Sequence, residues 1–102
     1  MNVITRKRIV EYAARHPDAA GPLMMWYRVA RKAKWRSIRD VRAAFPHADG
    51  MDVASGGVVT VFNIGGNKCR LVTAIHYNRQ RVYVLLLLTH AEYSKGTWKE
   101  SL

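Results

Sequence analysis

The chain has 102 residues, enough for one domain with one modest hydrophobic core, and we expect residues 1–102 to form that single domain. Its formal net charge is +10, from 17 lysines and arginines against 7 aspartates and glutamates, so a polyanionic partner is expected. Hydrophobic residues make up 49% of the sequence, which excludes a disordered basic tail because a core can form.

Cysteine usage and hydropathy indicate the compartment. Cys69 is the only cysteine, so no intrachain disulfide can form, and a reducing cytoplasm fits best. The N-terminus has no apolar signal core, and the longest apolar run, residues 82–88, is far shorter than the roughly 20 residues of a membrane span. We therefore expect a soluble cytoplasmic protein with no membrane partner.

The N-terminal half predicts one short strand and then helices. Residues 2–5 are of strand type, and Thr5 can cap the first helix. A proline at position 17 ends that helix, because the residue before proline disfavours helix. Ile9, Tyr12, Ala13 and His16 follow at helical spacing and share one face of this helix.

A second helix is predicted to start at Asp18, which can cap it, and its apolar stripe contains Trp26 and Tyr27. The opposite side of this helix carries Arg28, Arg31 and Lys32, with almost no acidic residue nearby, so these three are candidate RNA-binding residues. The alternative is an ordinary solvated helix face. A short third helix is expected to start at Ser37 and to close at residues 45–46.

The second half of the chain predicts a loop and three strands. Residues 46–57 contain a proline, two aspartates and three glycines without periodicity, which is typical of a loop. The strands are expected at 58–64, 69–77 and 82–89, with hairpin-like links between them. The last strand is apolar on both faces, so it is expected to be central in the sheet. The tail from residue 91 is expected to be short, with about one helical turn.

This order of elements predicts an α+β fold, in which an N-terminal strand and a three-stranded antiparallel meander form a four-stranded sheet packed on the helices. One face of the sheet buries against the two long helices. The other face is free to act as a working surface.

Candidate site residues gather at one end of the predicted sheet. Alternation places Lys68 and Arg70 on the same face, where two cations can grip phosphates. The alternative is that these two cations only prevent the edge of the sheet from pairing with other chains. His90, just past the last strand, is suited to proton transfer near neutral pH, or it is a strand-end histidine satisfied by backbone. Tyr93, three residues later, can stack on a base or cap the core.

Whether these side chains meet depends on strand register. If Tyr77 pairs with Val82, His90 falls opposite Cys69, and Arg70 falls opposite Thr89 on the other face. A bulge or the strand end would then be needed to bring Arg70 and His90 together.

Other kinds of site have little support. The four histidines have no metal-ligand spacing with one another or with Cys69, and no P-loop or dinucleotide fingerprint is present. Cys69 is interpreted as a small apolar strand residue. We expect no metal and no cofactor.

The run Phe62-Asn63-Ile64-x-Gly66-Asn67-Lys68-x-Arg70-Leu71-Val72, followed by Thr89-His90-x-Glu92-Tyr93, resembles the HigB-type toxins of the RelE/ParE superfamily from type II toxin–antitoxin systems. Shorter matches lie at residues 4–7, 16–17, 26–27 and 45–46, so the resemblance covers nearly the whole chain. Cys69 departs from the aromatic residue expected between Lys68 and Arg70.

The resemblance implies a RelE-like fold with a four-stranded antiparallel sheet. It implies an mRNA endonuclease, an mRNA interferase that cuts messages on translating ribosomes and so inhibits translation. It further implies neutralisation by a HigA-like helix-turn-helix antitoxin, with operator DNA contacted only through the toxin–antitoxin complex. By the matching positions, Lys68, Arg70, His90 and Tyr93 would be catalytic and Asn67 would bind RNA.

The chemistry that these residues support needs no metal. The RNA 2′-hydroxyl would attack the adjacent phosphate, leaving a cyclic phosphate and a free 5′-hydroxyl. Lys68 and Arg70 would stabilise the added charge, His90 would move a proton, and Tyr93 would orient the scissile nucleotide.

Two other functions compete with this one. A toxin of the same fold could inhibit DNA gyrase, although a pure inhibitor needs no proton carrier such as His90. A non-enzymatic RNA- or ribosome-binding protein could use the basic helices alone.

Overall fold

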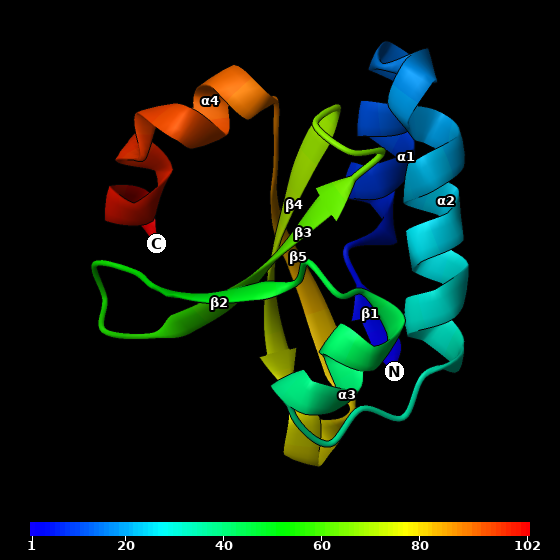
Figure 1. The fold of residues 1–102 in the computed structure, drawn as a ribbon, viewed down its shortest axis with the longest axis vertical. Helices are drawn as coiled ribbons and strands as arrows, with labels where there is room; N and C mark the ends of the chain where they lie inside the picture. The colour runs from blue at the N-terminus through cyan, green and yellow to red at the C-terminus, as the bar shows by residue number, and fades with distance from the viewer.

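The computed structural model describes residues 1–102, which form a twisted five-stranded sheet with the two long helices across one face (Figure 1). The strands are β1 (Asn2–Ile4), β2 (Asp49–Asp52), β3 (Val58–Ile64), β4 (Cys69–His76) and β5 (Arg81–Leu88). The α-helices are α1 (Arg6–Arg15), α2 (Pro17–Lys32), α3 (Ile38–Ala44) and α4 (His90–Lys95), and the 3-10 helices are η1 (Tyr77–Arg79) and η2 (Thr97–Ser101).

The sheet confirms the α+β class and the three-stranded meander, but it has one strand more than expected. Its order is β1-β5-β4-β3-β2, so β5 is an inner strand, as its apolar sequence predicted. The fully antiparallel arrangement was wrong for β1, which pairs with β5 in parallel. Two parallel neighbours cannot be joined by a tight hairpin, and here helices α1 and α2 lie in the long connection between them.

The segment expected to be a loop, residues 46–57, contains β2. This strand pairs antiparallel with β3 from Asp49 opposite Val61 to Asp52 opposite Val58. Its sequence, Asp-Gly-Met-Asp, holds no residue with high strand propensity, so only backbone pairing with β3 makes it a strand. β2 lies at the edge of the sheet, where charged residues discourage pairing with other chains.

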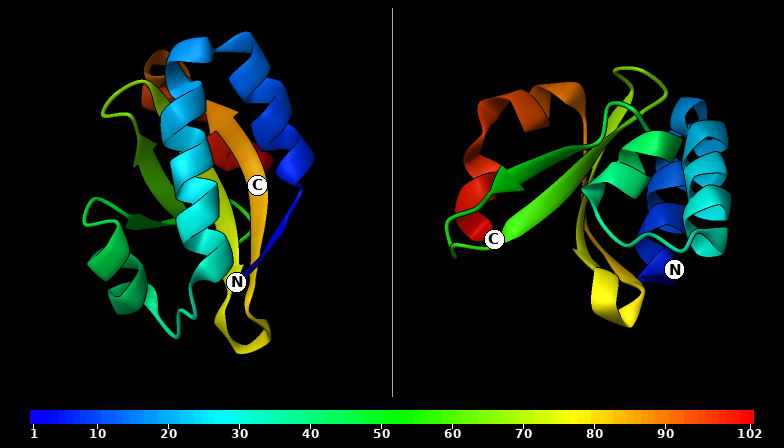
Figure 2. Two further views of the ribbon diagram at one scale, coloured as in Figure 1. Left: turned by 90° about the vertical axis from the view of Figure 1, so that its right-hand side faces the viewer. Right: turned by 60° about the horizontal axis from the view of Figure 1, so that its bottom comes forward.

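The two long helices bury the predicted apolar faces. Ile9 of α1 and Leu23, Trp26 and Ala30 of α2 are buried against the sheet. Burying each large apolar side chain contributes about 1.5–3 kcal/mol, so this layer supplies much of the stability. Figure 2 shows the sheet between this helical layer and the C-terminal α4–η2 segment.

The predicted helix caps were only partly right. Thr5 is the N-cap residue of α1, but its side chain makes no capping hydrogen bond. Asp18 does not cap α2: His16 takes that place and Pro17 is the first helical residue, with Asp18 inside the first turn. Proline suits this position because its missing N–H has no helical partner there. Ser37 is the N-cap of α3, again without a side-chain bond.

Two features of the β3–β4–β5 region set the position of the candidate site. The β3–β4 turn relies on Gly65 and Gly66, which have positive φ angles of 60° and 71°. At this φ a residue with a side chain is strained, and a Cβ on Gly65 would also lie 2.9 Å from Cδ of Lys68, so glycine is favoured at this position. The β4–β5 pairing contains a bulge between Val72 and Thr73, which shifts the register along the rest of the pair.

The C-terminal tail is more ordered than the single helical turn expected. It forms α4 and then η2, which places Trp98 over the sheet face away from the helices, in a small cluster with Val59 and Val72. None of the helices is both long enough and apolar enough to cross a membrane.

Candidate active site

Arg70 lies at the start of β4 and is buried, with only 7% of its surface exposed. Its guanidinium donates to the Gly66 carbonyl at 3.2 Å and to the Asn67 side-chain oxygen at 3.0 Å, and it lies 3.3 Å from Nδ1 of His90. No carboxylate pairs with it, since the two ion pairs in the structure involve other residues. A buried cation without an anion is costly and is ready to bind one.

His90 is the first residue of α4, and its Nδ1 lies 3.3 Å from the Arg70 guanidinium. The helix is held by a capping box, in which the Thr89 hydroxyl accepts from the Glu92 N–H at 3.2 Å and the Glu92 carboxylate accepts from the Thr89 N–H at 2.9 Å. These bonds lower the pKa of Glu92. A guanidinium cannot accept a hydrogen bond, so a hydrogen bond in this contact runs from Arg70 to Nδ1 of His90.

Tyr93 also contacts the Arg70 guanidinium. The Arg70 guanidinium carbon is 5.4 Å from the centre of the Tyr93 ring, and the ring of Trp98 stacks against Tyr93 at 5.4 Å. The Tyr93 hydroxyl donates to the Met51 sulfur at 3.0 Å. Burial raises the pKa of Tyr93, as does Asp49 to a lesser degree, so the phenol stays protonated near neutral pH and is no proton acceptor.

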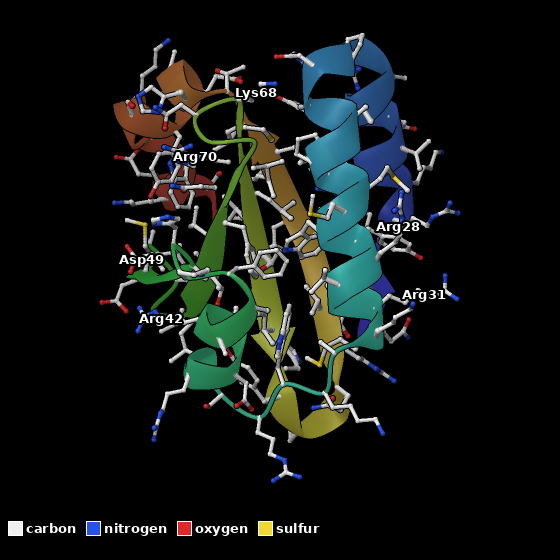
Figure 3. The ribbon with its side chains drawn as sticks, turned by 45° about the vertical axis from the view of Figure 1, so that its right-hand side comes forward. Arg28, Arg31, Arg42, Asp49, Lys68 and Arg70 are labelled. Atoms are coloured by element: carbon white, nitrogen blue, oxygen red, sulfur yellow. The ribbon has the colours of Figure 1, made fainter.

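Lys68 does not join this cluster, and the expectation that it shares a face with Arg70 was wrong. Its ammonium donates to the Asp18 carbonyl at 3.2 Å, at the start of α2. The reason is that β4 begins at Cys69, so Lys68 belongs to the turn, where strand alternation does not hold. Figure 3 shows Lys68 above the turn and Arg70 nearer the C-terminal segment.

The guessed register between the last two strands was also wrong. Ile75, not Tyr77, pairs with Val82, and Arg70 lies opposite Leu88 instead of Thr89. The bulge between Val72 and Thr73 shifts the pairing by one residue, so the register at Arg70 differs less from the assumed one than the register at Ile75 does. Since β5 ends at Leu88, His90 lies on α4 and not on the strand, so it can turn toward Arg70. Under the register assumed from the sequence, either a bulge or the strand end was needed to bring Arg70 and His90 together, and the structure has both.

The three cations of α2 lie elsewhere. Arg28, Arg31 and Lys32 are exposed on the outer side of the helical layer. Figure 3 shows Arg28 and Arg31 on α2, across the molecule from Arg70. They do not contribute to the Arg70 cluster, and any RNA that they contact lies along a different surface.

Cys69 points away from the cluster, as alternation predicts for a neighbour of Arg70. It is fully buried in the core between the sheet and the helices. Burial raises the pKa of its thiol to about 11, so it stays protonated at neutral pH. No group of three His, Cys, Asp or Glu side chains lies together in a way that could hold a metal ion.

Sequence reasoning missed Met51 and Trp98, which hold Tyr93 in place. Met51 lies on β2, a strand that the sequence did not predict, and the Trp98 indole donates to the Tyr93 carbonyl at 3.1 Å. The signal available for Trp98 was its presence as a lone tryptophan in a polar tail, since such a side chain needs a surface to cover.

Comparison with known proteins identifies the family of the chain. The family model described as HigB_toxin, the RelE-like toxic component of a toxin–antitoxin system, matches residues 19–96. The mRNA interferase HigB of Escherichia coli O6:H1 is 30% identical over 97 residues, covering 95% of this chain and 92% of that protein. The mRNA interferase toxin HigB of Escherichia coli strain K12 and the mRNA interferase HigB of Shigella flexneri are each 28% identical over 93 residues, covering 91% of this chain and 88% of theirs. The chain belongs to the HigB family of RelE-like toxins of toxin–antitoxin systems.

Proposed function

We propose that this chain is an mRNA endoribonuclease, an mRNA interferase, and that Arg70 and His90 form its cleavage centre. The observation that carries the proposal is a buried guanidinium with no carboxylate partner, in contact with an exposed imidazole. Such a pair suits a phosphodiester, whose negative charge complements the arginine and whose cleavage needs a proton carrier. The names of the HigB relatives, which are mRNA interferases, support the same activity.

The proposed reaction begins with attack by the RNA 2′-hydroxyl on the adjacent phosphorus. A new O2′–P bond forms as the P–O5′ bond breaks. The 2′-hydroxyl proton passes to solvent water and O5′ gains a proton, which leaves a 2′,3′-cyclic phosphate and a free 5′-hydroxyl. The charge on the phosphate oxygens grows in the transition state. Arg70 is positioned to stabilise it, and donors of this kind contribute about 10²–10³-fold each to the rate.

His90 is assigned to donate a proton to the leaving 5′-oxygen. In the free protein the Arg70 guanidinium lies 3.3 Å from Nδ1 of His90. A phosphate bound by Arg70 would draw the guanidinium toward itself and place negative charge beside His90, which favours the imidazolium form that can donate. Substrate binding would thus prepare the acid.

The remaining candidates take supporting roles. Tyr93 stays protonated, holds Arg70 through its ring and orients the scissile nucleotide. Asn67 is exposed beside Arg70, and its side-chain oxygen can contact RNA once it no longer accepts the hydrogen bond from Arg70. Lys68 is exposed as well, but it must leave the Asp18 carbonyl to become a second cation at the phosphate.

Membership of the family implies an antitoxin partner. We extend this to a HigA-like helix-turn-helix antitoxin, to operator DNA contacted only through the toxin–antitoxin complex, and to cleavage on cytoplasmic ribosomes. Translating ribosomes would align the message in the site, and alignment of this kind can supply several kcal/mol of a reaction barrier. Arg28, Arg31 and Lys32 are the exposed cations assigned to contacts with RNA on that particle.

The experiment is primer extension on a reporter mRNA in a purified translation system, with wild type, His90→Ala and His47→Ala side by side. His47 is an exposed histidine of the segment before β2 and serves as the matched control. We expect cuts inside the reading frame that need ribosomes, that disappear with His90→Ala and that persist with His47→Ala.

The absence of cuts by wild type, despite arrested growth on expression, would sink the nuclease proposal and favour gyrase inhibition or plain ribosome binding. Cuts that survive His90→Ala would leave the nuclease in place but remove His90 from its centre.

A further inference from the structure

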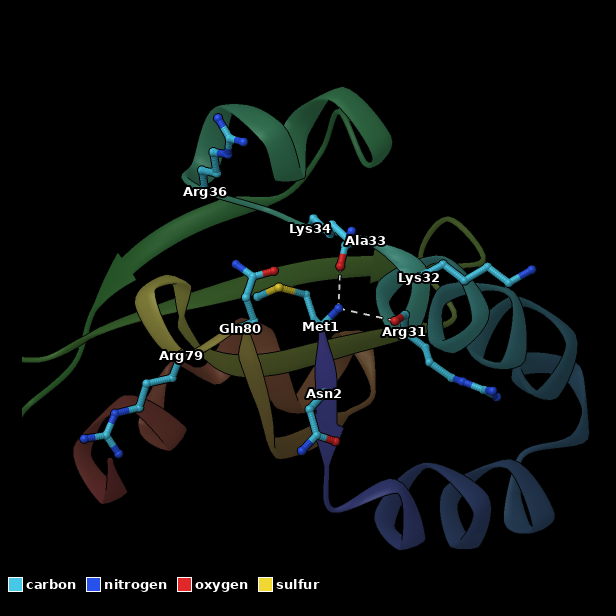
Figure 4. A pocket seen from close by; sticks show the side chains of 9 residues that line it. All are labelled: Met1, Asn2, Arg31, Lys32, Ala33, Lys34, Arg36, Arg79 and Gln80. Carbon is cyan, nitrogen blue, oxygen red and sulfur yellow. Dashed lines mark hydrogen bonds between the residues drawn. The ribbon is translucent and has the colours of Figure 1, made fainter.

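A pocket lined by cations lies at the end of the sheet opposite Arg70. It has a volume of about 650 Å³ and is formed by the end of α2, the segment that follows it and the β4–β5 turn (Figure 4). Five of its nine lining residues are cations, namely Arg31, Lys32, Lys34, Arg36 and Arg79. No acidic residue lines it.

The five cations are free to bind anions. Neither of the two ion pairs in the structure involves any of them. Asp40 accepts from the backbone N–H of Arg36 at 2.8 Å and not from its guanidinium. The pKa of the Met1 amino group, which also lines the pocket, is lowered by burial and then by the charge of Lys34. Like charges are therefore crowded together, and a bound anion would relieve their repulsion.

A second hollow adjoins this one and has different chemistry. It has a volume of about 390 Å³, lies between α3 and the sheet, and shares Arg36 with the basic pocket. Its walls include Ile38, Ile75, the half-buried ring of Tyr77, and Val58, whose surface is 65% exposed. An apolar surface of this kind with an aromatic ring suits a nucleobase.

From this pairing we propose that the two hollows form a second RNA-binding site, in which the basic pocket holds backbone phosphates and the apolar hollow takes an unpaired base of the same single strand. The proposal rests on the proposed function for the identity of the polymer as RNA. The site is separate from the cleavage centre, because β4 from Arg70 to His76 spans roughly 20 Å at about 3.3 Å per residue.

Single-stranded RNA fits these features better than an acidic peptide or a duplex. An acidic peptide would satisfy the cations, but it gives no planar apolar group for the hollow beside Arg36. A duplex has the higher charge density, yet its bases are paired and stacked and cannot enter the hollow. A preference for single strands over duplexes therefore separates base binding from simple charge attraction.

The test is fluorescence anisotropy with a labelled 2′-O-methyl oligoribonucleotide, which cannot be cleaved because its 2′-oxygen is blocked. Lys34→Ala/Arg79→Ala removes two cations from the pocket, and Lys7→Ala/Arg39→Ala removes the same charge from surfaces outside it. We expect the pocket variant to weaken binding several-fold and to flatten the slope of log affinity against log salt by about 1.4, since each phosphate that a cation neutralises adds about 0.7 to that slope. The control variant should keep the wild-type slope.

A second pair of variants tests the base. Val58→Asn lowers the apolar character of the hollow, and Val10→Asn makes the same change at an exposed valine on α1. We expect wild type and Val10→Asn to prefer the single strand over the duplex, and Val58→Asn to lose that preference. Thermal melting of each variant confirms that it is folded.

Three results would overturn the proposal: equal slopes for the pocket and control variants, no preference of wild type for single strands, or displacement of the probe by polyglutamate as effectively as by unlabelled RNA.

Cleavage kinetics separate this proposal from the proposed function. The kcat for cleavage should be unchanged in the pocket variants, so a pocket variant that binds RNA as wild type does would leave the cleavage proposal intact. A raised KM confined to long substrates would support a site that holds the cleaved strand itself. An unchanged KM with weakened binding would support a site that holds a separate RNA.

Discussion

Arg70 combines burial of its charge with the absence of an opposite charge beside it. Its guanidinium is buried and is satisfied only by neutral acceptors, the Gly66 carbonyl, the Asn67 side chain and the His90 ring. Removing a charge from water without an opposite charge nearby is unfavourable. An RNA phosphate would supply that opposite charge, so the cost is offset only in the complex with substrate.

We predict that Arg70→Met strongly slows cleavage without destabilising the fold. Cleavage should fall by about 10²–10³-fold, because the donors aimed at the phosphate are removed. The free energy of unfolding should be unchanged or higher by about 1 kcal/mol, because a well-packed apolar side chain replaces an unpaired charge. Urea denaturation and single-turnover cleavage of the same samples test both parts.

Arg70→Lys is the matched comparison for this prediction. It keeps the charge but loses the planar fork that reaches three acceptors, so both activity and stability should decrease. If Arg70→Met instead unfolds the protein while Arg70→Lys is fully active, Arg70 is a structural residue and not a phosphate ligand.

At the scale of elements, the short helix α4 decides where His90 points. Six residues are too few for a stable isolated helix, so α4 depends on its capping box and on the stacking of Tyr93 against Trp98. The Ser94 hydroxyl also donates to the His90 carbonyl at 2.8 Å. The orientation of His90 is therefore set by the capping residue that precedes it.

We predict that Thr89→Ala costs about 1 kcal/mol of stability and lowers kcat, because the N-cap bond to Glu92 is removed and the first turn of α4 frays. Thr89→Ser keeps the hydroxyl and should restore both values. Thermal melting and kcat measured for the two variants provide the test. Loss of stability in Thr89→Ala with an unchanged kcat would show that α4 does not position His90.

At the scale of the whole molecule, the net charge is +10 and the structure contains only two ion pairs, both exposed, so most of its cations have no acidic partner. Such pairs contribute little to stability, so the fold depends on its apolar layers. Excess charge of one sign repels itself in the compact state and at the same time attracts RNA. Salt should therefore act on stability and on binding with opposite signs.

We predict that raising the salt concentration from about 50 to about 200 mM raises Tm slightly, because self-repulsion is screened, while RNA affinity falls by at least about tenfold. Thermal melts and anisotropy titrations over the same salt series test this. A Tm that falls with salt would mean that the ion pairs matter more than the repulsion, and a flat binding curve would mean that phosphates are not the ligand.

Local patterns in the sequence were enough to predict the meander, both hairpins and the buried faces of α1 and α2. Strand alternation, turn glycines and helical spacing depend on neighbouring residues, so they can be read without knowing the fold. Alternation also placed Cys69 in the core, away from Arg70. The family motif brought Arg70, His90 and Tyr93 forward as candidates, and the structure brings these three together.

What required the tertiary structure was the direction of each side chain at the ends of elements. Lys68 turns to the Asp18 carbonyl because β4 starts one residue later, and His90 reaches Arg70 through a bulge and a helix that local patterns did not locate. Strand β2 exists only because β3 offers backbone partners. Sequence spacing determines which residues can share a face within one element, whereas register, bulges and edge pairing arise from contacts between elements, which only the folded chain makes.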